Sequence, residues 1–461
     1  MSARTAGMPF LAALAAADIA FAYQQTAVVP VIPDIERALG IGQSWGAWLL
    51  SGYLLVATVA APVVGRLADR YGRRPMLVLG MGVFLAGSVG AALAPDAVVI
   101  IAFRALQGVG GAVYPLSLSV VREELPADRV SFATGLLTGG FGIGTALGFA
   151  AAGPLTAAVS WRLVFAVGAA VVALAIPALL RWVPRRPGPS TGGVDAPGGA
   201  LLGGSLALLL VALTVAPKQH GLGWALPAVL LIAAGATGGL WLRHENRAAS
   251  PLVDAGTLRS PTELWTNGAT LAVGYALFGV YYLLPRLVAD PKHGFGAGTA
   301  VIGLYLLPIA VGQLLAAPAL RRMQGAATPR RPYAIGLALM ALGAGGMAFG
   351  SGATAVGFGA AGFVLGCGAG LAIGASGALA TLGADEEHAA VATALNSTVR
   401  RVGGGLGSQV SAAVLLVAGT AAPGWALCFG LAAVLCLAGA GVAARTPVVR
   451  PDPDGSARNP E

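Results

Sequence analysis

Charged residues are scarce in this chain. Asp, Glu, Lys and Arg make up 10% of its 461 residues, whereas 56% are apolar. A soluble globular domain carries about 25% charged residues, so a soluble enzyme is nearly excluded. Disorder requires low hydrophobicity and high charge, and the apolar runs do not alternate as the strands of a transmembrane β-barrel do. The composition therefore predicts an all-α polytopic membrane protein.

Cysteine and histidine are also rare, and enzymatic motifs are absent. Cys367, Cys428 and Cys436 lie within apolar runs, so we expect them to be packing residues rather than a disulfide framework. The four histidines show no metal-ligand spacing, and no GxxxxGK[ST] phosphate loop occurs. We expect no catalytic residues, no metal site, no cofactor and no direct use of ATP.

The apolar runs are long enough to cross a bilayer. A helix needs roughly 20 apolar residues to span the hydrocarbon. The sequence predicts fourteen such spans, at residues 10–32, 45–64, 76–95, 98–120, 132–154, 161–182, 199–216, 223–242, 265–288, 299–320, 332–350, 353–380, 389–418 and 424–444.

The basic residues indicate an orientation. When the N-terminus is placed in the cytoplasm, most Lys and Arg residues fall in cytoplasmic segments, as the positive-inside rule requires. An even number of spans then puts both termini in the cytoplasm. The net charge of +9 is accounted for by these segments, so we expect a lipid bilayer and no nucleic acid as partner. The Arg-rich, Lys-poor composition is typical of a GC-rich bacterial genome, and we expect the cytoplasmic membrane as location.

The chain repeats itself. Residues 133–136 read Ala-Thr-Gly-Leu and residues 392–395 read Ala-Thr-Ala-Leu. At the same offset, Gly144 and Gly148 correspond to Gly403 and Gly407. Spans one to six and nine to fourteen are therefore two copies of one six-helix unit, which is typical of transporters with a site between two repeats.

The repeat sets the expected domain boundaries. They are residues 1–183 for the N-terminal six-helix bundle, 184–250 for a linker and an inserted hairpin of two helices, 251–446 for the C-terminal six-helix bundle, and 447–461 for a disordered cytoplasmic tail.

The segment after the second predicted span carries a specific motif. It reads GRLADRYGRRP over residues 65–75. This segment closely resembles the signature loop between helices two and three of the major facilitator superfamily. The resemblance implies a gate formed by Gly65, Asp69, Arg70, Gly72, Arg73 and Arg74. Asp69 is expected to bridge to a neighbouring helix end, and Gly65 and Gly72 to permit close approach and a tight turn.

Three further segments resemble the fourteen-helix drug:proton antiporters of that superfamily. They are RALQGVGGA at 104–112, the glycines at 140, 144 and 148 with Gly153-Pro154, and YQQTAV at 23–28 with Ile32-Pro33. The second match is partial, because Thr145 and Phe149 stand where that pattern often has prolines. The resemblance covers nearly the whole chain. It implies two six-helix bundles plus two inserted helices and proton-driven export of amphipathic compounds.

Ionisable groups inside the predicted spans are few. Each costs about 2.5–3.5 kcal/mol to insert, so such groups tend to be functional. Asp18 lies roughly 12 Å into its span at helical rise. The related antiporters commonly have an aspartate where this chain has Gln24, and an amide cannot carry a proton near neutral pH. We therefore predict Asp18 as the proton-coupling carboxyl. The alternatives are a static ion pair or an acid exposed to water at the mouth.

Three arginines also lie within predicted spans. Arg104 is predicted to take part in proton coupling, with organisation of the bundle through backbone carbonyls as the alternative. Its repeat partner is Phe363, which suggests that the N-terminal half handles the proton and the C-terminal half mostly substrate. Arg400 and Arg401 either line the cavity, snorkel to the cytoplasm or join the two halves, and we favour the last two roles.

Polar and aromatic residues within the spans supply the expected substrate lining. Such a mixed lining suits amphipathic and also cationic compounds. The set is Tyr23, Gln24, Gln25, Tyr53, Gln107, Tyr114, Asn267, Tyr275, Tyr281, Tyr282, Gln313 and Asn396. The set expected to pack helices closely is Gly140, Gly144, Gly148, Gly403 and Gly407.

The sequence therefore predicts a monomeric, proton-coupled antiporter that exports drug-like or secondary-metabolite compounds by alternating access. Two alternatives rank below this prediction. One is an exporter or importer of a single metabolite, and the other is a non-transporting membrane sensor on the same fold.

Overall fold

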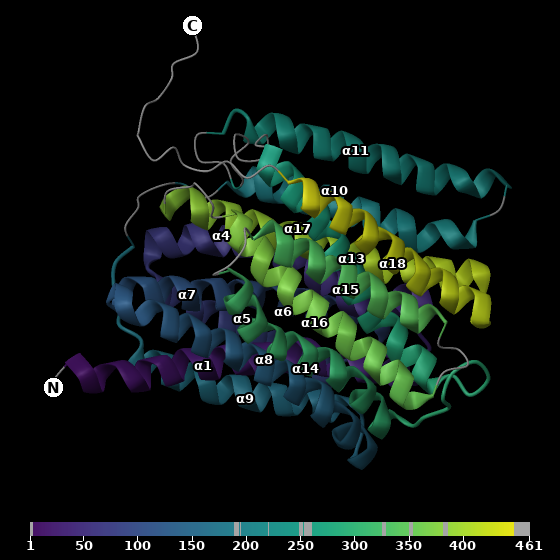
Figure 1. Cartoon of the computed structure of the whole chain (residues 1–461), viewed down its shortest axis with the longest axis horizontal. Helices are drawn as coiled ribbons and strands as arrows, with labels where there is room; N and C mark the ends of the chain where they lie inside the picture. Colours follow the sequence, from purple (N-terminus) through teal and green to yellow (C-terminus); the bar gives the residue numbers. More distant parts are fainter. Residues whose placement is uncertain are drawn as a thin grey trace, which may run out of the picture.

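The computed structural model is helical throughout the residues that it describes (Figure 1). These are residues 3–188, 193, 195–219, 221–248, 252, 261–324, 329–349, 354–380 and 386–446. No β-strand occurs among them, which confirms the predicted all-α class. The predicted tail at 447–461 lies outside the described residues.

A long helical stretch lies on each predicted range. The N-terminal unit holds α1 (Ala3–Ala27), η1 (Val29–Val31), α2 (Ile32–Leu39), α3 (Gln43–Gly46), α4 (Trp48–Tyr71), α5 (Arg73–Leu93), α6 (Ala97–Gln107), η2 (Gly108–Ala112), α7 (Val113–Glu124), α8 (Ala127–Ala158) and α9 (Trp161–Trp182). Next come α10 (Ala196–Val215), η3 (Ala216–Lys218), η4 (Gly221–Trp224) and α11 (Ala225–Glu245). The C-terminal unit holds α13 (Pro261–Ala289), α14 (Thr299–Gln324), α15 (Arg330–Ala348), α16 (Ala355–Ala380), α17 (Glu386–Ala418) and α18 (Ala422–Arg445).

Twelve of these stretches are long and apolar enough to cross a membrane. The helices α1 and α15, of 25 and 19 residues, are not among the twelve. The count of fourteen spans is thus not confirmed by length and hydropathy in the described residues.

Two predicted spans differ from single straight helices. The first ends at Ala27 and continues as η1 and α2, because Pro30 and Pro33 lack the N–H that an α-helix interior needs. The fourth changes to a 3₁₀ turn at η2. A Cβ at Gly108 would lie 2.5 Å from the carbonyl oxygen of Tyr53 in α4. The glycines therefore let this turn lie directly on α4.

Glycine seams build both halves in the same way. In the N-terminal half α8 packs on α1, and in the C-terminal half α17 packs on α13. A Cβ at Gly144 would lie 2.5 Å from the carbonyl oxygen of Ile19, whereas one at Gly140 would make an ordinary contact. At Gly407 a Cβ would overlap the Tyr275 carbonyl. Backbone-to-backbone contact thus joins the paired helices.

The two halves meet along two helix pairs. Helix α8 packs on α14, and α4 packs on α17. The hairpin of α10 and α11 stands beside this second pair, with α10 against both α4 and α17 and α11 at the edge of the bundle (Figure 1). We call the end of the molecule that holds α2 the α2 end. Residues 65–75 form the gate loop, and the end that holds them is the gate-loop end.

The seam predicts a stability difference between two glycines of one helix. Gly407→Ala should cost about 1–3 kcal/mol, as overpacking does, because the new methyl group has only backbone to displace. Gly405→Ala is the matched control, since its Cβ would lie 3.8 Å from Leu210 and alanine favours a helix over glycine. Thermal unfolding of the detergent-solubilised protein should show a lower Tm for the first variant only. Equal Tm values would contradict the packing.

Candidate functional site

Asp18 is buried inside the N-terminal half. Its side chain, on α1, is fully shielded from solvent. The hydroxyl of Ser117 on α7 donates a hydrogen bond of 3.0 Å to Asp18 Oδ1. Asp18 Oδ2 is buried without a partner among the described residues. The carboxyl group therefore has an oxygen that is free to hold a proton, and it forms no ion pair with a described residue.

Arg104 lies in a different polar cluster. Its Nε donates 3.0 Å to the Leu49 carbonyl, and its Nη1 donates 2.5 Å to Gln107 Oε1. Gln107 in turn donates 2.8 Å to Ser88. The guanidinium lies over the ring of Tyr53, 5.0 Å from its centre. These contacts join α4, α5 and α6, so the arrangement of Arg104 is that of a helix organiser. The structure does not bring it into contact with Asp18.

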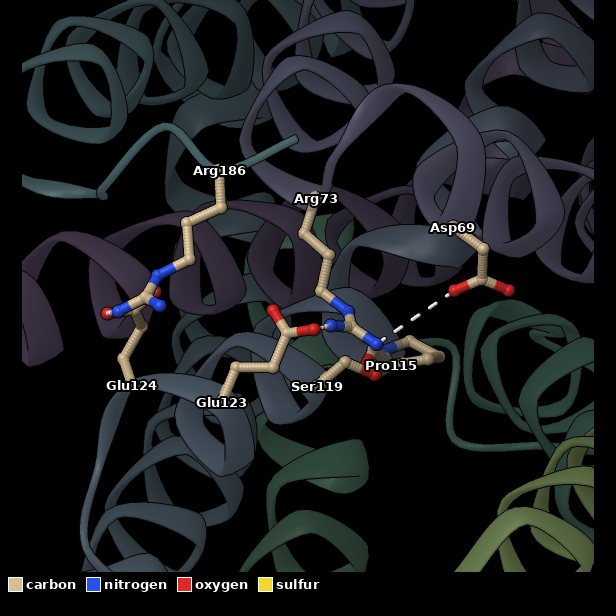
Figure 2. A network of polar contacts seen from close by, with 7 residues as sticks. All are labelled: Asp69, Arg73, Pro115, Ser119, Glu123, Glu124 and Arg186. Carbon is tan, nitrogen blue, oxygen red and sulfur yellow. Dashed lines mark hydrogen bonds and ion pairs between the residues drawn. The ribbon is translucent and has the colours of Figure 1, made fainter. Parts of the chain in front are cut away.

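The gate loop is held together by charge (Figure 2). Arg73 lies between Asp69, at 3.9 Å, and Glu123, with which it forms an ion pair. Arg186 Nη2 donates 2.9 Å to Glu124 beside this pair. All these groups belong to α4, α5, α7 or the segment after α9. Asp69 is therefore linked through Arg73 to the end of α7, and its described partner lies within the N-terminal half.

The segment after α9 covers the gate loop. Gly72 has a φ of 93°, which favours glycine, and a Cβ there would overlap the Arg186 carbonyl. Arg74 donates a hydrogen bond to the Leu180 carbonyl near the end of α9. A glycine at position 72 therefore permits both the turn and the close approach of the segment after α9. At Gly65, where the sequence also led us to expect a close approach, a Cβ would meet only open space.

At the α2 end, the two halves are joined by a buried ion pair. Arg286 on α13 pairs with Glu36 on α2, and both side chains are largely shielded. Burial raises the pKa of the Glu36 carboxyl, and the Arg286 guanidinium acts in the opposite direction. Arg286 Nη1 also donates 2.7 Å to the Tyr282 carbonyl, and the Tyr282 hydroxyl donates 2.9 Å to the Gln43 carbonyl. The two halves are therefore bonded to each other at this end.

A second contact lies beside the ion pair. The Thr299 hydroxyl at the start of α14 donates 2.6 Å to Asp34 Oδ2 on α2. Asp34 also accepts 2.5 Å from Arg37. The short amphipathic helix α2 thus contacts both α13 and α14 of the other half.

Deeper in the molecule, α17 bonds to the N-terminal half. Arg401 donates to the carbonyls of Ala57 and Gly111, at 3.3 and 2.9 Å. Gln409 donates 2.8 Å to the Ser51 hydroxyl. Arg401 therefore makes inter-half contacts, which is one of the two roles favoured from sequence.

Aromatic residues cluster on both sides of the boundary between the halves. Tyr281 packs edge-on against Phe149 of the N-terminal half at 5.3 Å and against Phe278 at 5.6 Å. Its hydroxyl accepts 3.1 Å from Gln313. In the N-terminal half, the half-buried Tyr114 bonds to Thr138 at 2.9 Å. Tyr281 and Gln313 are thus placed near the boundary, whereas the hydrogen bond of Tyr114 stays within the N-terminal half.

The C-terminal half holds an amide cluster. Asn396 Nδ2 donates 3.2 Å to Asn267 and 2.7 Å to Thr270, and its Oδ1 accepts 3.0 Å from Ser376. Asn267 Nδ2 donates 3.0 Å to the buried carboxylate of Glu263. The structure brings these two predicted substrate residues together, but within one half and already bonded to each other.

The other predicted lining residues lie in separate places. Tyr23 and Gln24 are buried, and neither the Tyr23 hydroxyl nor the Gln24 amide has a partner among the described residues. Gln24 faces α9, where a Cβ at Gly168 would overlap its amide. Gln25 is half-buried, and Tyr275 is buried on α13. Tyr53, Gln107 and Tyr282 are engaged in the clusters described above.

Sequence reasoning missed several polar partners. Ser117 could have been found from the repeat, because Ser376 stands at the same 259-residue offset as the paired glycines. Glu36 and Arg286 lie outside the predicted spans or at an end of one, where charged residues give no signal of pairing. Glu263 falls just before the predicted ninth span.

The chain matches known membrane transporters over most of its length. A family model described as Major Facilitator Superfamily matches residues 14–408. The chain is 29% identical over 417 residues to the tetracenomycin C resistance and export protein of Streptomyces glaucescens, covering 87% of this chain and 74% of the relative. It is 26% identical over 388 residues to multidrug resistance protein Stp of Mycobacterium tuberculosis (strain CDC 1551 / Oshkosh), covering 83% and 71%.

A further match is shorter. The uncharacterized MFS-type transporter YvkA of Bacillus subtilis (strain 168) is 29% identical over 261 residues. This match covers 56% of the chain and little more than half of the relative, 57%. The family match and these relatives place the chain among transporters and not among enzymes. With more than half of its length matched by the family model, this multi-pass membrane protein belongs to the Major Facilitator Superfamily.

Proposed function

We propose that this chain is a proton-coupled antiporter that exports amphipathic drug-like or secondary-metabolite compounds by alternating access. Relatives that cover most of the chain are named for drug resistance and export. The observation that carries the coupling is Asp18, a fully buried carboxyl with one bonded and one unpartnered oxygen. Such a group in the hydrocarbon is costly unless it takes up a proton.

The contacts between the halves support alternating access. An ion pair and a hydrogen bond between α2 and the C-terminal half close the α2 end. At the gate-loop end, the described ion pairs lie within the N-terminal half, the segment after α9 and the inserted hairpin, and none of them reaches the C-terminal half. We take this as the state closed at the α2 end. Tilting the halves would break the first set of contacts and bring the gate loop toward the other half.

The membrane arrangement completes the proposal. Counting α1 and α15 as spans gives fourteen. This count is supported by their lengths and by their packing on α8 and α16 within the bundle. The positive-inside rule then places the gate-loop end and both termini in the cytoplasm, and the α2 end outside. We propose a monomer in the cytoplasmic membrane of a bacterium.

Replacing Asp18 tests the coupling. Asp18→Asn should reduce pH-gradient-driven uptake of an aromatic dye into everted vesicles to the level of vesicles without the protein, because an amide cannot take up and release a proton near neutral pH. Binding of the dye to the purified variant should persist. The matched control is Asp128→Asn, which removes an exposed carboxyl at the start of α8 and should leave transport unchanged.

Two results would refute the assignment. Exchange of dye for protons that survives in Asp18→Asn would show that another group carries the proton. A parent protein that binds dye but never moves it, with or without a gradient, would favour the sensor alternative.

Cross-linking tests the closure of the α2 end. The double variant Asp34→Cys, Thr299→Cys places two thiols where the native side chains are 2.6 Å apart. Oxidation should join the halves at this end and abolish transport, and a reducing agent should restore it. The single variant Asp34→Cys, treated in the same way, controls for the native cysteines, of which two are buried and one is half-buried. Full transport by the cross-linked protein would exclude opening at the α2 end.

A further inference from the structure

Arg400 lies between the two halves. It is on α17 and is only partly shielded from solvent. The next residue, Arg401, donates 2.9 Å to the Gly111 carbonyl of the N-terminal half, three residues before Tyr114. On the other side, a Cβ at Gly274 of α13 would overlap the Arg400 carbonyl. In this position the charge of Arg400 acts on the hydroxyls of Tyr114 and Tyr333, one in each half. Arg400 is therefore placed where the two halves meet, with part of its side chain open to solvent.

Arg400 differs from the other intramembrane arginines in having no partner. Its guanidinium makes no hydrogen bond or ion pair with any described residue, whereas Arg104 and Arg401 each bind backbone carbonyls. Arg286 pairs with a carboxylate. A guanidinium in a membrane interior needs acceptors. Its planar donors suit carboxylates and other oxyanions in particular.

The charges around Arg400 do not neutralise it. Asp18 also acts on Tyr114, so the carboxyl and the guanidinium lie near the same tyrosine. Asp18, however, is bonded to Ser117 and not to Arg400. The neighbouring Arg401 adds a second positive charge, and no described carboxylate pairs with either arginine. The space beside Tyr114 is therefore electropositive.

A partly exposed aromatic pair, Tyr114 and Phe141, lies in the N-terminal half and is backed by the buried ring of Phe21. Tyr114 packs on Phe141 with ring centres 5.3 Å apart, and Phe141 packs on Phe21 at 6.1 Å. Flat aromatic ligands stack on such rings, with an energy of about 0.5–1.5 kcal/mol per pair beyond burial. A ring surface next to an unpaired guanidinium is suited to a flat aromatic compound that carries a negative charge.

We propose that the compounds carried by this protein are aromatic anions, including weak acids that ionise as phenolates or carboxylates, and that Arg400 binds their negative charge. This rests on the proposed export function and names its substrate class. It replaces the cationic substrates that the sequence also allowed. Specificity arises because the anion supplies the acceptor that the guanidinium lacks, and a neutral or cationic analogue leaves the guanidinium unpaired.

A matched pair of probes tests the substrate class. 8-Anilinonaphthalene-1-sulfonate and N-phenyl-1-naphthylamine share one scaffold and differ by a sulfonate. The full chain in lipid nanodiscs, after subtraction of the signal from empty nanodiscs, should bind the anion at least about tenfold more tightly than the neutral probe. A ratio of this size corresponds to the free energy of one charge-assisted hydrogen bond. Arg400→Gln should bring the ratio of the two Kd values close to one and leave the neutral probe unaffected. Arg400→Lys should retain part of the preference.

The neighbouring arginine supplies the control. Arg401→Gln removes the same charge from a guanidinium that is already bonded, so it should keep most of the preference. A parent protein that binds the neutral probe or the cation ethidium as tightly as the anion would overturn the proposal without any variant. Equal losses in both glutamine variants would also overturn it. Proton-coupled transport of ethidium alone would leave the antiporter standing and refute the anion class, whereas Arg400-dependent anion binding without any proton exchange would refute only the antiporter.

Discussion

A bilayer supplies neither hydrogen bonds nor counter-charges, so every polar group inside this molecule must find its partner in the protein. Most do so. Arg104 and Arg401 bind backbone carbonyls, and Arg286 binds a carboxylate. Some do not, among them the Tyr23 hydroxyl and the Gln24 amide. Two of the less satisfied groups carry a charge when ionised: Asp18, with one unpartnered oxygen, and Arg400, whose guanidinium bonds to no described residue. Both act on Tyr114. A polar group whose hydrogen bonds are complete stabilises the conformation in which they form. A polar group without a partner can instead bind a proton or a ligand. Asp18 and Arg400 are the groups to which we assign the proposed proton and the proposed ligand.

The internal repeat allows the two halves to be compared position by position, and they differ in chemistry at the position of Asp18. The backbone of Gly144 faces Ile19, and that of Gly403 faces Leu271, so α1 and α13 occupy equivalent places. By the same register, Asp18 corresponds to Thr270. In the N-terminal half this position carries a carboxyl, and in the C-terminal half it carries a hydroxyl within a bonded amide cluster. The same backbone position thus holds an ionisable group in one half and a hydroxyl in the other, where the carboxylate of the cluster, Glu263, is bonded through Asn267. This asymmetry agrees with a division of labour in which only the N-terminal half exchanges protons.

The sequence predicts the helices and the gate loop much better than it predicts the contacts between them. Hydropathy located a helix on each expected range, because helix length and apolar content are local properties. The α6–η2–α7 break was missed, since it depends on how closely Gly108 approaches α4. The pair of Glu36 and Arg286 is separated by 250 residues, and only the packing of α2 on α13 brings it together. Gln24 was expected in the substrate lining because it is a polar residue within a predicted span, but its side chain faces α9, which the sequence alone does not reveal.

The inserted hairpin is bound at the place where the halves would separate. Trp48 Nε1 on α4 donates 2.9 Å to the Thr214 hydroxyl on α10. That hydroxyl oxygen also lies 3.3 Å from Gln409 Oε1 on α17. One threonine of the hairpin thus contacts both halves. If α4 and α17 move apart, Thr214 can follow only one of them, and the other loses a buried hydrogen bond, which costs about 1–3 kcal/mol. In the proposed transport cycle, the hairpin therefore stabilises the state closed at the α2 end through its contacts with both halves.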